Sequence, residues 1–359
     1  MKILMLVNWI VRRCNSIPTD IQPPDYYVEG EAYWFFKYFH NEVEVEIADI
    51  HSFDLLEKFE KNYLRFYVLQ TFRILPYLKK YDLIISHGMQ SGILLSLLRT
   101  VFHLKTPKHI VFDIGSFNSA AESGWMLKFM GYSSKSIDGM IYHTSKQIEY
   151  YQKFYPWLVD KSKFIRFGTD AEFFSGEDLM IDQTNERYIL CVGQNKRDWN
   201  TLFKAYDRLH TDIRLRLIGC NKKETASKNI EFIPFMPIKD LMKEIKNALF
   251  CVLPLEYMNY SFGQMTLLQQ MILKKTVVAA RVPSIIDYVR DTIDAILYEP
   301  QNDMDLAKKM DYLILNSSLC EELGEQAYLT VRNTMNERIM ANEIEKYIFE
   351  IGSCYENNK

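Results

Sequence analysis

The alternation of short apolar segments with amphipathic segments, which runs through nearly the whole chain, limits the possible folds more than any other feature. In the first half, runs of apolar and β-branched residues predict strands at Lys2–Val7, Val43–Ala48, Leu83–Ser86, His109–Ile114, Gly139–His143 and Phe164–Phe167. Helical periodicity between them predicts helices at Glu29–His40, Phe53–Tyr81 (with a break before Pro76), Gly92–Phe102 and Ser145–Phe154. Strands that alternate with helices form a parallel, doubly wound sheet.

A polar stretch without apolar periodicity, from Ser175 to about Arg187, separates this pattern from a second one, and we predict the interdomain linker there. The second pattern predicts strands at Tyr188–Val192, Ile213–Ile218, Ile230–Ile233, Phe250–Leu253 and Thr276–Ala280. An amphipathic tail, about Met304 to Ile351, could pack along the second domain and reach back to the first. We therefore predict an α/β protein with two Rossmann-like, doubly wound domains, residues 1–175 and 176–359, that face a central cleft.

Charge and cysteine usage exclude several classes of function. A formal net charge of −3 argues against nucleic-acid binding, which needs a basic surface. The six cysteines are scattered without a Cys-x-x-Cys pair, so we expect buried thiols in a reducing compartment. No apolar run reaches the roughly 18 residues of a membrane span, and the start is too short for a signal peptide. We expect a cytoplasmic protein.

Two apolar strands of the second half each lead into a glycine-containing turn and then into a helix. The first turn lies in Val192–Trp199, and the second lies in Tyr260–Gln269. Such turns aim backbone N–H groups and the positive end of a helix at a phosphate. Two of them that face one cleft would hold a nucleotide diphosphate.

Four blocks, in order between about residues 160 and 310, resemble the family-4 glycosyltransferases. Phe164–Asp170, with Phe173-Phe174, is similar to the family's strand-to-linker signature, and Tyr188–Leu202 is similar to its phosphate loop. Ser261–Val278 resembles its segment with two glutamates, and Ala295–Ala307 resembles the tail that follows. The resemblance implies the GT-B fold, a retaining mechanism, a UDP-sugar or GDP-sugar as donor, and no cofactor or metal.

The resemblance places phosphate-binding residues in the first of the two turns. The family's arginine after Gly193 is Gln194 here, while Arg197 falls where its lysine is expected. We interpret Arg197, with Lys196 beside it, as the catalytic residues that stabilise the leaving diphosphate. The alternative is an exposed charge pair at a helix start, in which Arg197 pairs with Asp198.

The two glutamates of the second segment correspond to Ser261 and Gln269. In the family the second glutamate accepts hydrogen bonds from the ribose hydroxyls, and the amide oxygen of Gln269 can do so without a charge. Ser261 is also explained as the N-cap of a Ser-x-x-Gln capping box. Glu256 would offer a carboxylate to the donor sugar, or it is a solvated loop charge. The predicted donor-binding residues are Gly193, Gln194, Glu256, Ser261, Phe262, Gly263, Gln264, Thr266 and Gln269.

Two candidate catalytic residues of the first half follow strands that end at the cleft. His87 lies where the family often carries a histidine, and the alternative is a structural histidine of the turn. Asp113 lies near the position of the family's active-site histidine, and the alternative is an N-cap of the next helix. The family's glycine-rich first turn is replaced by a long loop, residues 8–27, which binds the acceptor or only connects two elements.

Aromatic and basic residues interleave in residues 58–80, and Trp125–Lys135 adds further ones. Such a face can lie on anionic lipid. Aromatic residues at helical spacing are alternatively part of the core, so peripheral membrane contact stays open. The acceptor class stays open as well: a glycan, a lipid-linked molecule or a small molecule.

The residues together predict transfer of a hexose-type sugar from a nucleotide-diphosphate sugar to a hydroxyl group. A nucleotide-sugar epimerase on the same fold is one alternative, with only Asp113 and Glu256 to act as acid and base. A catalytically degenerate subunit that binds nucleotide sugar is another, because Gln194, Ser261 and Gln269 each replace a charged family residue.

One motif of a different transferase class occurs in the chain. Asp303-Met304-Asp305 has the Asp-x-Asp form of a metal site. It follows Pro300 and starts a predicted helix, where helix capping explains the aspartates. We therefore predict no metal site.

Overall fold

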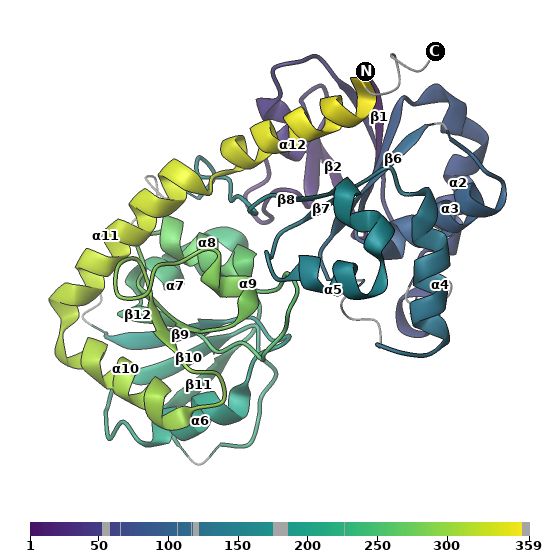
Figure 1. Ribbon diagram of the computed structural model, residues 1–359. Helices are drawn as coiled ribbons and strands as arrows, with labels where there is room; N and C mark the ends of the chain where they lie inside the picture. The colour runs from purple at the N-terminus through teal and green to yellow at the C-terminus, as the bar shows by residue number, and fades with distance from the viewer. Residues whose placement is uncertain are drawn as a thin grey trace.

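The computed structural model describes residues 1–51, 58–64, 66–105, 107–115, 117, 122–174, 186–225 and 227–353 (Figure 1). Within this part of the chain, two six-stranded parallel sheets form the two halves of the molecule. The predicted α/β fold with two doubly wound sheets is confirmed. The predicted linker falls largely on residues 175–185, which lie outside the described residues, so the domain boundary at 175 stays a prediction.

The first sheet has the strand order β4-β1-β5-β6-β7-β8. Its strands are β1 (Lys2–Leu6), β4 (Glu44–Ala48), β5 (Leu83–His87), β6 (Lys108–Asp113), β7 (Gly139–Tyr142) and β8 (Ser162–Phe164). Every residue of β5 and β7 is buried, as expected for parallel strands that helices cover on both faces. The helical segments of this half are η1 (Trp34–Tyr38), η2 (Glu60–Leu64), α2 (Val68–Ile74), η3 (Leu75–Lys80), α3 (Met89–Val101), α4 (Trp125–Ser133), η4 (Ser134–Ser136), α5 (Gln147–Phe154) and η5 (Pro156–Lys161).

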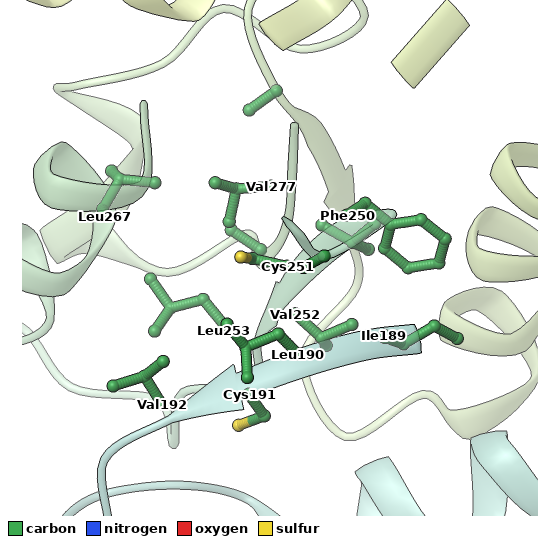
Figure 2. Close-up of a cluster of buried hydrophobic side chains, with 14 of the residues drawn as sticks. Ile189, Leu190, Cys191, Val192, Phe250, Cys251, Val252, Leu253, Leu267 and Val277 are labelled. Atoms are coloured by element: carbon green, nitrogen blue, oxygen red, sulfur yellow. The ribbon is translucent and has the colours of Figure 1, made fainter. Parts of the chain in front are cut away.

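The second sheet has the order β11-β10-β9-β12-β13-β14, which is the strand order of the Rossmann dinucleotide-binding fold. Its strands are β9 (Tyr188–Val192), β10 (Arg214–Ile218), β11 (Ile230–Ile233), β12 (Phe250–Leu253), β13 (Val277–Ala280) and β14 (Ile296–Tyr298). The side chains of β9, β12 and α8 gather in one core, as Leu190, Leu253 and Leu267 do in Figure 2. The helices of this half are α6 (Trp199–Asp207), α7 (Ile238–Asn247), α8 (Gln264–Ile272), α9 (Pro283–Ile286), α10 (Asp303–Leu315) and α11 (Ser317–Thr334).

The chain crosses between the two halves in two segments that lie side by side. Thr169 donates its N–H to the carbonyl of Met335 (3.1 Å), and Glu337 donates to the carbonyl of Thr169 (2.8 Å). A side chain at Gly168 would place its Cβ 2.4 Å from the carbonyl oxygen of Asn336, so only glycine allows this close approach. The two crossing segments therefore form one hydrogen-bonded connection.

The last helix, α12 (Glu337–Ser353), packs on the first half of the molecule, although it follows the second half in sequence (Figure 1). Its buried side chains join the core around β1 and β5; they are Met340, Ala341, Ile344, Tyr347 and Ile348. The hydroxyl of Tyr347 accepts a hydrogen bond from the backbone N–H of Met140 in β7 (3.0 Å). This helix thus ties the second crossing segment to the first sheet.

The predicted helix at Glu29–His40 is wrong, since the structure has only the short 3₁₀ segment η1 there. Four consecutive side chains, Tyr33 to Phe36, are buried. A surface helix buries one stripe of its residues and cannot bury four in a row, so close burial outweighs helical periodicity here. The predicted strand Phe164–Phe167 is also shifted, because β8 ends at Phe164, where the chain leaves the sheet toward the second half.

Other short elements were not predicted from the sequence. Strands β2 (Arg12–Cys14) and β3 (Tyr26–Val28) pair in parallel within the predicted loop, and β14 closes the second sheet. Each has three residues, which is too short to show a periodicity. The predicted helix Phe53–Tyr81 divides into η2, α2 and η3, and its residues 53–57 lie outside the described residues.

Candidate functional site

The strand order of each sheet reverses once, and ligands of doubly wound folds bind beyond the carboxyl ends of the strands at such a point. In the second sheet the reversal lies between β9 and β12. The loops that follow these strands are joined by hydrogen bonds from Asp198 N to Pro254 O (2.7 Å) and from Glu256 N to Lys196 O (3.2 Å). Both predicted phosphate turns therefore meet at one place.

Arg197 is buried in the first turn, with 5% of its surface exposed. Its guanidinium donates to the carbonyls of Val192 (Nη2, 2.9 Å) and Asn195 (Nη1, 3.1 Å) and, more weakly, to Thr266 Oγ1 (3.5 Å). The alternative of an exposed pair with Asp198 is wrong, because the carboxylate of Asp198 caps α6 through the N–H of Thr201 (3.0 Å).

The charge of Arg197 has no acidic partner among the residues that the structure describes. Burial lowers the pKa of Arg197 from its ordinary value, and no carboxylate opposes this shift. A buried cation without a counter-ion is costly, since water is excluded and the charge is not compensated. The site is therefore electrostatically suited to an anion.

Lys196 and Glu256 lie at the surface beside this turn. Their charged groups are 3.8 Å apart, and about half of each side chain is exposed. The backbone of Lys196 has a positive φ of 55°. Glu256 therefore pairs with Lys196 in solvent, which favours the interpretation of Glu256 as a loop charge.

The second turn ends in the N-terminus of α8. Gly263 is the N-cap and has a φ of 86°, a left-handed conformation that favours glycine, and no side chain caps the helix. The predicted capping box of Ser261 and Gln264 is therefore wrong. Its geometry fails because the helix begins at Gln264 rather than directly after Ser261.

Ser261 and Gln264 instead face the first half of the molecule. The hydroxyl of Ser261 donates to Gln147 Oε1 (2.8 Å), and Gln264 Nε2 donates to Thr144 Oγ1 (3.0 Å). A Cβ at Gly115, in the loop after β6, would lie 2.3 Å from the ring of Tyr260. The second turn thus contacts the first half on one side and the cavity described next on the other.

A cavity of about 430 Å³ lies between the two halves at this switch point. Seven of the predicted donor-binding or catalytic residues line it: Gly193, Gln194, Arg197, Phe262, Gly263, Thr266 and Gln269. The first half contributes the loop tip of residues 20–25. Asp20 in this loop is neutralised by Arg12 (Nη1 to Oδ2, 2.8 Å), and burial raises the pKa of Asp25. Lys196, Glu256, Ser261 and Gln264 do not line the cavity.

The first sheet reverses its strand order between β1 and β5, where His87 ends β5. The ring of His87 contacts Trp9 and Trp34, with ring centroids 4.8 and 5.5 Å away. Its Nδ1 is buried without a hydrogen-bond partner among the described residues. Burial, together with the nearby His143, lowers the pKa of His87 to about 3, so the ring is neutral near pH 7. The alternative was a turn histidine that is hydrogen-bonded to the backbone, and Nδ1 makes no such bond with the described residues.

Asp113 is fully buried at the end of β6. Its Oδ1 accepts from Gly115 N (3.0 Å), and its Oδ2 accepts from the hydroxyl of Tyr151 (2.6 Å) and from Gln147 Nε2 (3.3 Å). These contacts favour a structural role in the loop after β6 over contact with an acceptor. Gln147 also binds Ser261, so Asp113 positions the contact between the halves.

Neither aspartate of Asp303-Met304-Asp305 caps α10. The N-cap is Asn302, whose side chain accepts from Asp305 N (3.0 Å), and Asp303 pairs with Arg208. Among the described residues, no cluster of three or more His, Cys, Asp or Glu side chains is arranged to hold a metal ion. Every helix in the same part of the chain is too short or too polar to cross a lipid bilayer.

Several residues of the cleft were not predicted from the sequence. Trp9 lies beside His87, and Gln22 contacts Gln269 across the cavity. His143 donates from Nδ1 to the carbonyl of Ile165 (2.7 Å), and burial lowers the pKa of His143 to about 4. The only sequence signal for Trp9 and Gln22 was the replacement of the expected short turn by a long loop.

Residues 181–330 match the family model of glycosyl transferases group 1. No curated protein matches the chain significantly in sequence. Sucrose-phosphate synthase from Thermosynechococcus elongatus has a similar structure, with a TM-score of 0.68 and 15% identity over 99% of this chain and 100% of that chain. HepE from Anabaena in complex with UDP-glucose has a TM-score of 0.66 and 13% identity over 98% and 100%. A glycosyltransferase from Rickettsia africae has a TM-score of 0.66 and 15% identity over 86% and 90%.

The family match covers most of the second half of the chain, including both phosphate turns. The structural matches cover both halves and share the arrangement of two Rossmann-like domains. The chain is therefore a glycosyltransferase with the GT-B fold.

Proposed function

We propose that the chain is a retaining glycosyltransferase that moves a sugar from a UDP-sugar or GDP-sugar to a hydroxyl group. One observation carries the proposal: Arg197 is a buried cation without a carboxylate partner among the described residues, and it lines the cavity at the β9/β12 switch point. The N-terminus of α8, at Gly263, borders the same cavity. A diphosphate supplies the missing negative charge to both groups.

In the proposed reaction, the acceptor oxygen attacks the anomeric carbon from the face that the diphosphate leaves. The bond between that carbon and the phosphate oxygen breaks, and the leaving phosphate takes the acceptor's proton. Arg197 and the N–H groups at the start of α8 stabilise the charge that develops on the diphosphate, while Lys196, which does not line the cavity, has no part in it. Arg197 also holds the loop of Gly193 in shape through the carbonyl of Val192. The scheme needs no metal or cofactor.

The donor base is proposed from one structural neighbour. HepE from Anabaena has been crystallised with UDP-glucose and shares the fold over the whole chain. Gln269 lines the cavity near Phe262, and its amide oxygen is the proposed acceptor for the ribose hydroxyls. We therefore favour a UDP-sugar over a GDP-sugar.

The acceptor is proposed to bind on the β1/β5 side of the cleft, beside His87 and Trp9. An aromatic ring offers its face to the apolar side of a sugar, and an acceptor hydroxyl that enters beside Trp9 would supply the partner that the buried Nδ1 of neutral His87 lacks among the described residues. A glycan, a lipid-linked acceptor and a small molecule are all compatible with these groups. Asp113 is too deeply buried to take part.

Contact with an anionic membrane is proposed for the outer surface of α2, α3 and α4, which lie next to one another on one face of the first sheet (Figure 1). Large aromatic side chains are exposed on these helices or on the segments next to them: Tyr63 in η2 (77%), Phe102 directly after α3 (64%) and Trp125 at the start of α4 (70%). Lys80 lies over the ring of Tyr77, 4.6 Å from its centroid. Aromatic and basic side chains together suit the interface of an anionic bilayer.

Flotation with phosphatidylglycerol vesicles tests this contact, with phosphatidylcholine vesicles for comparison. The protein should float only with the anionic vesicles, and Trp125→Ser should weaken flotation. Leu315→Ser, at an equally exposed site on the second half, serves as the control. Equal behaviour of both variants, or no flotation of the parent, would remove the membrane from the proposal.

An epimerase finds less support than a transferase. Of the two carboxylates that could serve as its acid and base, Asp113 is fully buried and Glu256 pairs with Lys196 at the surface. A non-catalytic subunit that binds nucleotide sugar differs from an active transferase only in its lack of turnover, so an activity measurement separates the two.

The experiment that tests the proposed function is incubation with a panel of UDP- and GDP-sugars, with excess EDTA present, followed by NMR. We expect release or transfer of one sugar that keeps the anomeric configuration of the donor, at a rate that EDTA does not change. An inverted product would reject the retaining mechanism. If EDTA abolishes the activity and Mg²⁺ or Mn²⁺ restores it, protein groups alone do not stabilise the charge of the leaving diphosphate.

A further inference from the structure

The long loop after β1 carries one glutamine across the cleft. The pair β2–β3 supports the base of this loop, and Arg12 N donates to Asp25 O (2.9 Å). At the tip, Asp25 N donates to Gln22 O (2.9 Å), which closes a turn, and Arg12 neutralises Asp20. Gln22 is therefore presented on a braced turn rather than on a free loop.

The tip of this turn contacts the second half at two helices. The side chain of Gln269 in α8 donates from Nε2 to Gln22 Oε1 (2.7 Å), and Gln22 Nε2 lies 3.7 Å from the sulfur of Met265. The N–H of Ile238 at the start of α7 points to Asp20 O (3.4 Å). Gln22 and Gln269 are separated by 247 residues in sequence and lie on opposite walls of one cavity.

The hydrogen bond decides which way the amide of Gln269 faces. Its N–H is used by Gln22, and its Oε1 receives no hydrogen bond from the described residues. Gln269 itself is only 7% exposed. An amide that is held at its nitrogen presents its oxygen to the cavity, which is the atom that a ribose hydroxyl requires.

We propose that Gln22 is a positioning residue for the donor: it orients the amide of Gln269 across the cleft, so that the nucleotide site is built from both halves of the molecule. This inference rests on the proposed function.

The test is the affinity for UDP, measured by titration calorimetry, together with the donor KM and kcat. Gln22→Ala should raise the dissociation constant and the KM roughly 5- to 10-fold, the usual effect of one lost neutral hydrogen bond, with kcat within about twofold. Gln22→Glu keeps the chain length and an acceptor oxygen, so it should restore the affinity. Gln152→Ala, an exposed glutamine on α5, is the matched control and should behave as the parent does.

A double-mutant cycle separates positioning from loop stability. If Gln22 acts through Gln269, Gln22→Ala should have no further effect on UDP affinity in a Gln269→Leu background. Equal UDP affinity of Gln22→Ala and the parent, no rescue by Gln22→Glu, or an additive cycle would overturn the inference. The inference would also be overturned if Gln22→Ala changed only the melting temperature and not the UDP affinity. A parent that binds neither UDP nor GDP would instead overturn the proposed function.

Discussion

The two strand-order reversals of this protein lie in sheets of the same kind, yet the groups that they present to the cleft differ in charge. At the β9/β12 reversal, a short glycine turn holds the buried cation of Arg197 beside the N-terminus of α8. At the β1/β5 reversal, a long loop brings Trp9 against the neutral ring of His87. The fold supplies two similar positions, and the loops make one suited to a diphosphate and the other to an uncharged acceptor.

The largest expected effect is at the charged reversal. Arg197→Ala should lower turnover roughly 100-fold or more, because removal of a charge from a desolvated phosphate site costs several kcal/mol. Steady-state kinetics check this, with circular dichroism to confirm the fold. Arg208→Ala, which removes an exposed arginine paired with Asp303, is the control and should be nearly silent. If a folded Arg197→Ala protein has unchanged kinetics, the charge of Arg197 does not contribute to catalysis, and the difference in charge between the two reversals has no role in the mechanism.

The neutral reversal should respond in a different way. His87→Phe keeps the contact with Trp9 and removes the unshared nitrogen, so turnover should fall about 10- to 30-fold, between the loss of a neutral hydrogen bond and that of a catalytic donor. UDP affinity should not change. Because the pKa of His87 is about 3, its charge should cause no step in the pH–rate profile between pH 6 and 8. A change in UDP affinity would mean that the two reversals are not separate sites.

Substitutions at Gln269 sharpen the assignment of the charged side. Gln269→Leu should weaken UDP binding about 5- to 10-fold through the loss of a neutral acceptor. Gln269→Glu should keep or improve the affinity, since a carboxylate makes a stronger bond to ribose hydroxyls and the amide of Gln22 can reverse. If calorimetry finds the same UDP affinity for the parent, Gln269→Leu and Gln269→Glu, then Gln269 does not contact the donor.

The smallest effect on activity is expected at the connection between the halves, where a substitution should change stability instead. Lys37 pairs with Asp170 (2.5 Å) and with Glu337 (3.4 Å) at the crossing segments, and burial with the nearby Asp170 raises the pKa of Glu337 to about 7. The folded protein thus holds this proton to a higher pH than the unfolded chain does. Its stabilising contribution is complete below the unfolded value of 4.5 and is lost as the pH rises through about 7.

Glu337→Gln imitates the protonated side chain at every pH. Its melting temperature should equal that of the parent near pH 5 and exceed it above pH 8, with a difference of at most about 3 kcal/mol in the free energy of unfolding. Thermal melts at the two pH values measure this. A parent that is the more stable protein above pH 8 would contradict the sign. Turnover at pH 6 should be unaffected, because the group lies outside both reversals.

The fold could largely be predicted from the sequence, and the site could be predicted only in part. Strands β9 and β12 match their predicted bounds to the residue, because each is a continuous apolar run that is fully buried in a parallel sheet. The edge strand β11 matches its predicted bounds as well, although it contains Glu231. The loops that follow the neighbouring parallel strands β9 and β12 lie at the same edge of the sheet, so the cavity that Gly193 and Gln269 share could be predicted. Contacts between residues far apart in sequence, such as Gln22 with Gln269, leave no local pattern. The burial of Arg197 was equally hidden, since a charged residue in a turn is ordinarily exposed.

The most direct measurement is a crystal structure of the protein with UDP. The diphosphate should lie at the start of α8, within hydrogen-bond distance of its first N–H groups and beside Arg197, with the ribose hydroxyls at Gln269 Oε1. The β1/β5 reversal should hold no phosphate. A second cavity, beside the crossing segments, is lined by Arg332 and Arg338. A diphosphate bound there, or at His87 and Trp9, would contradict the account.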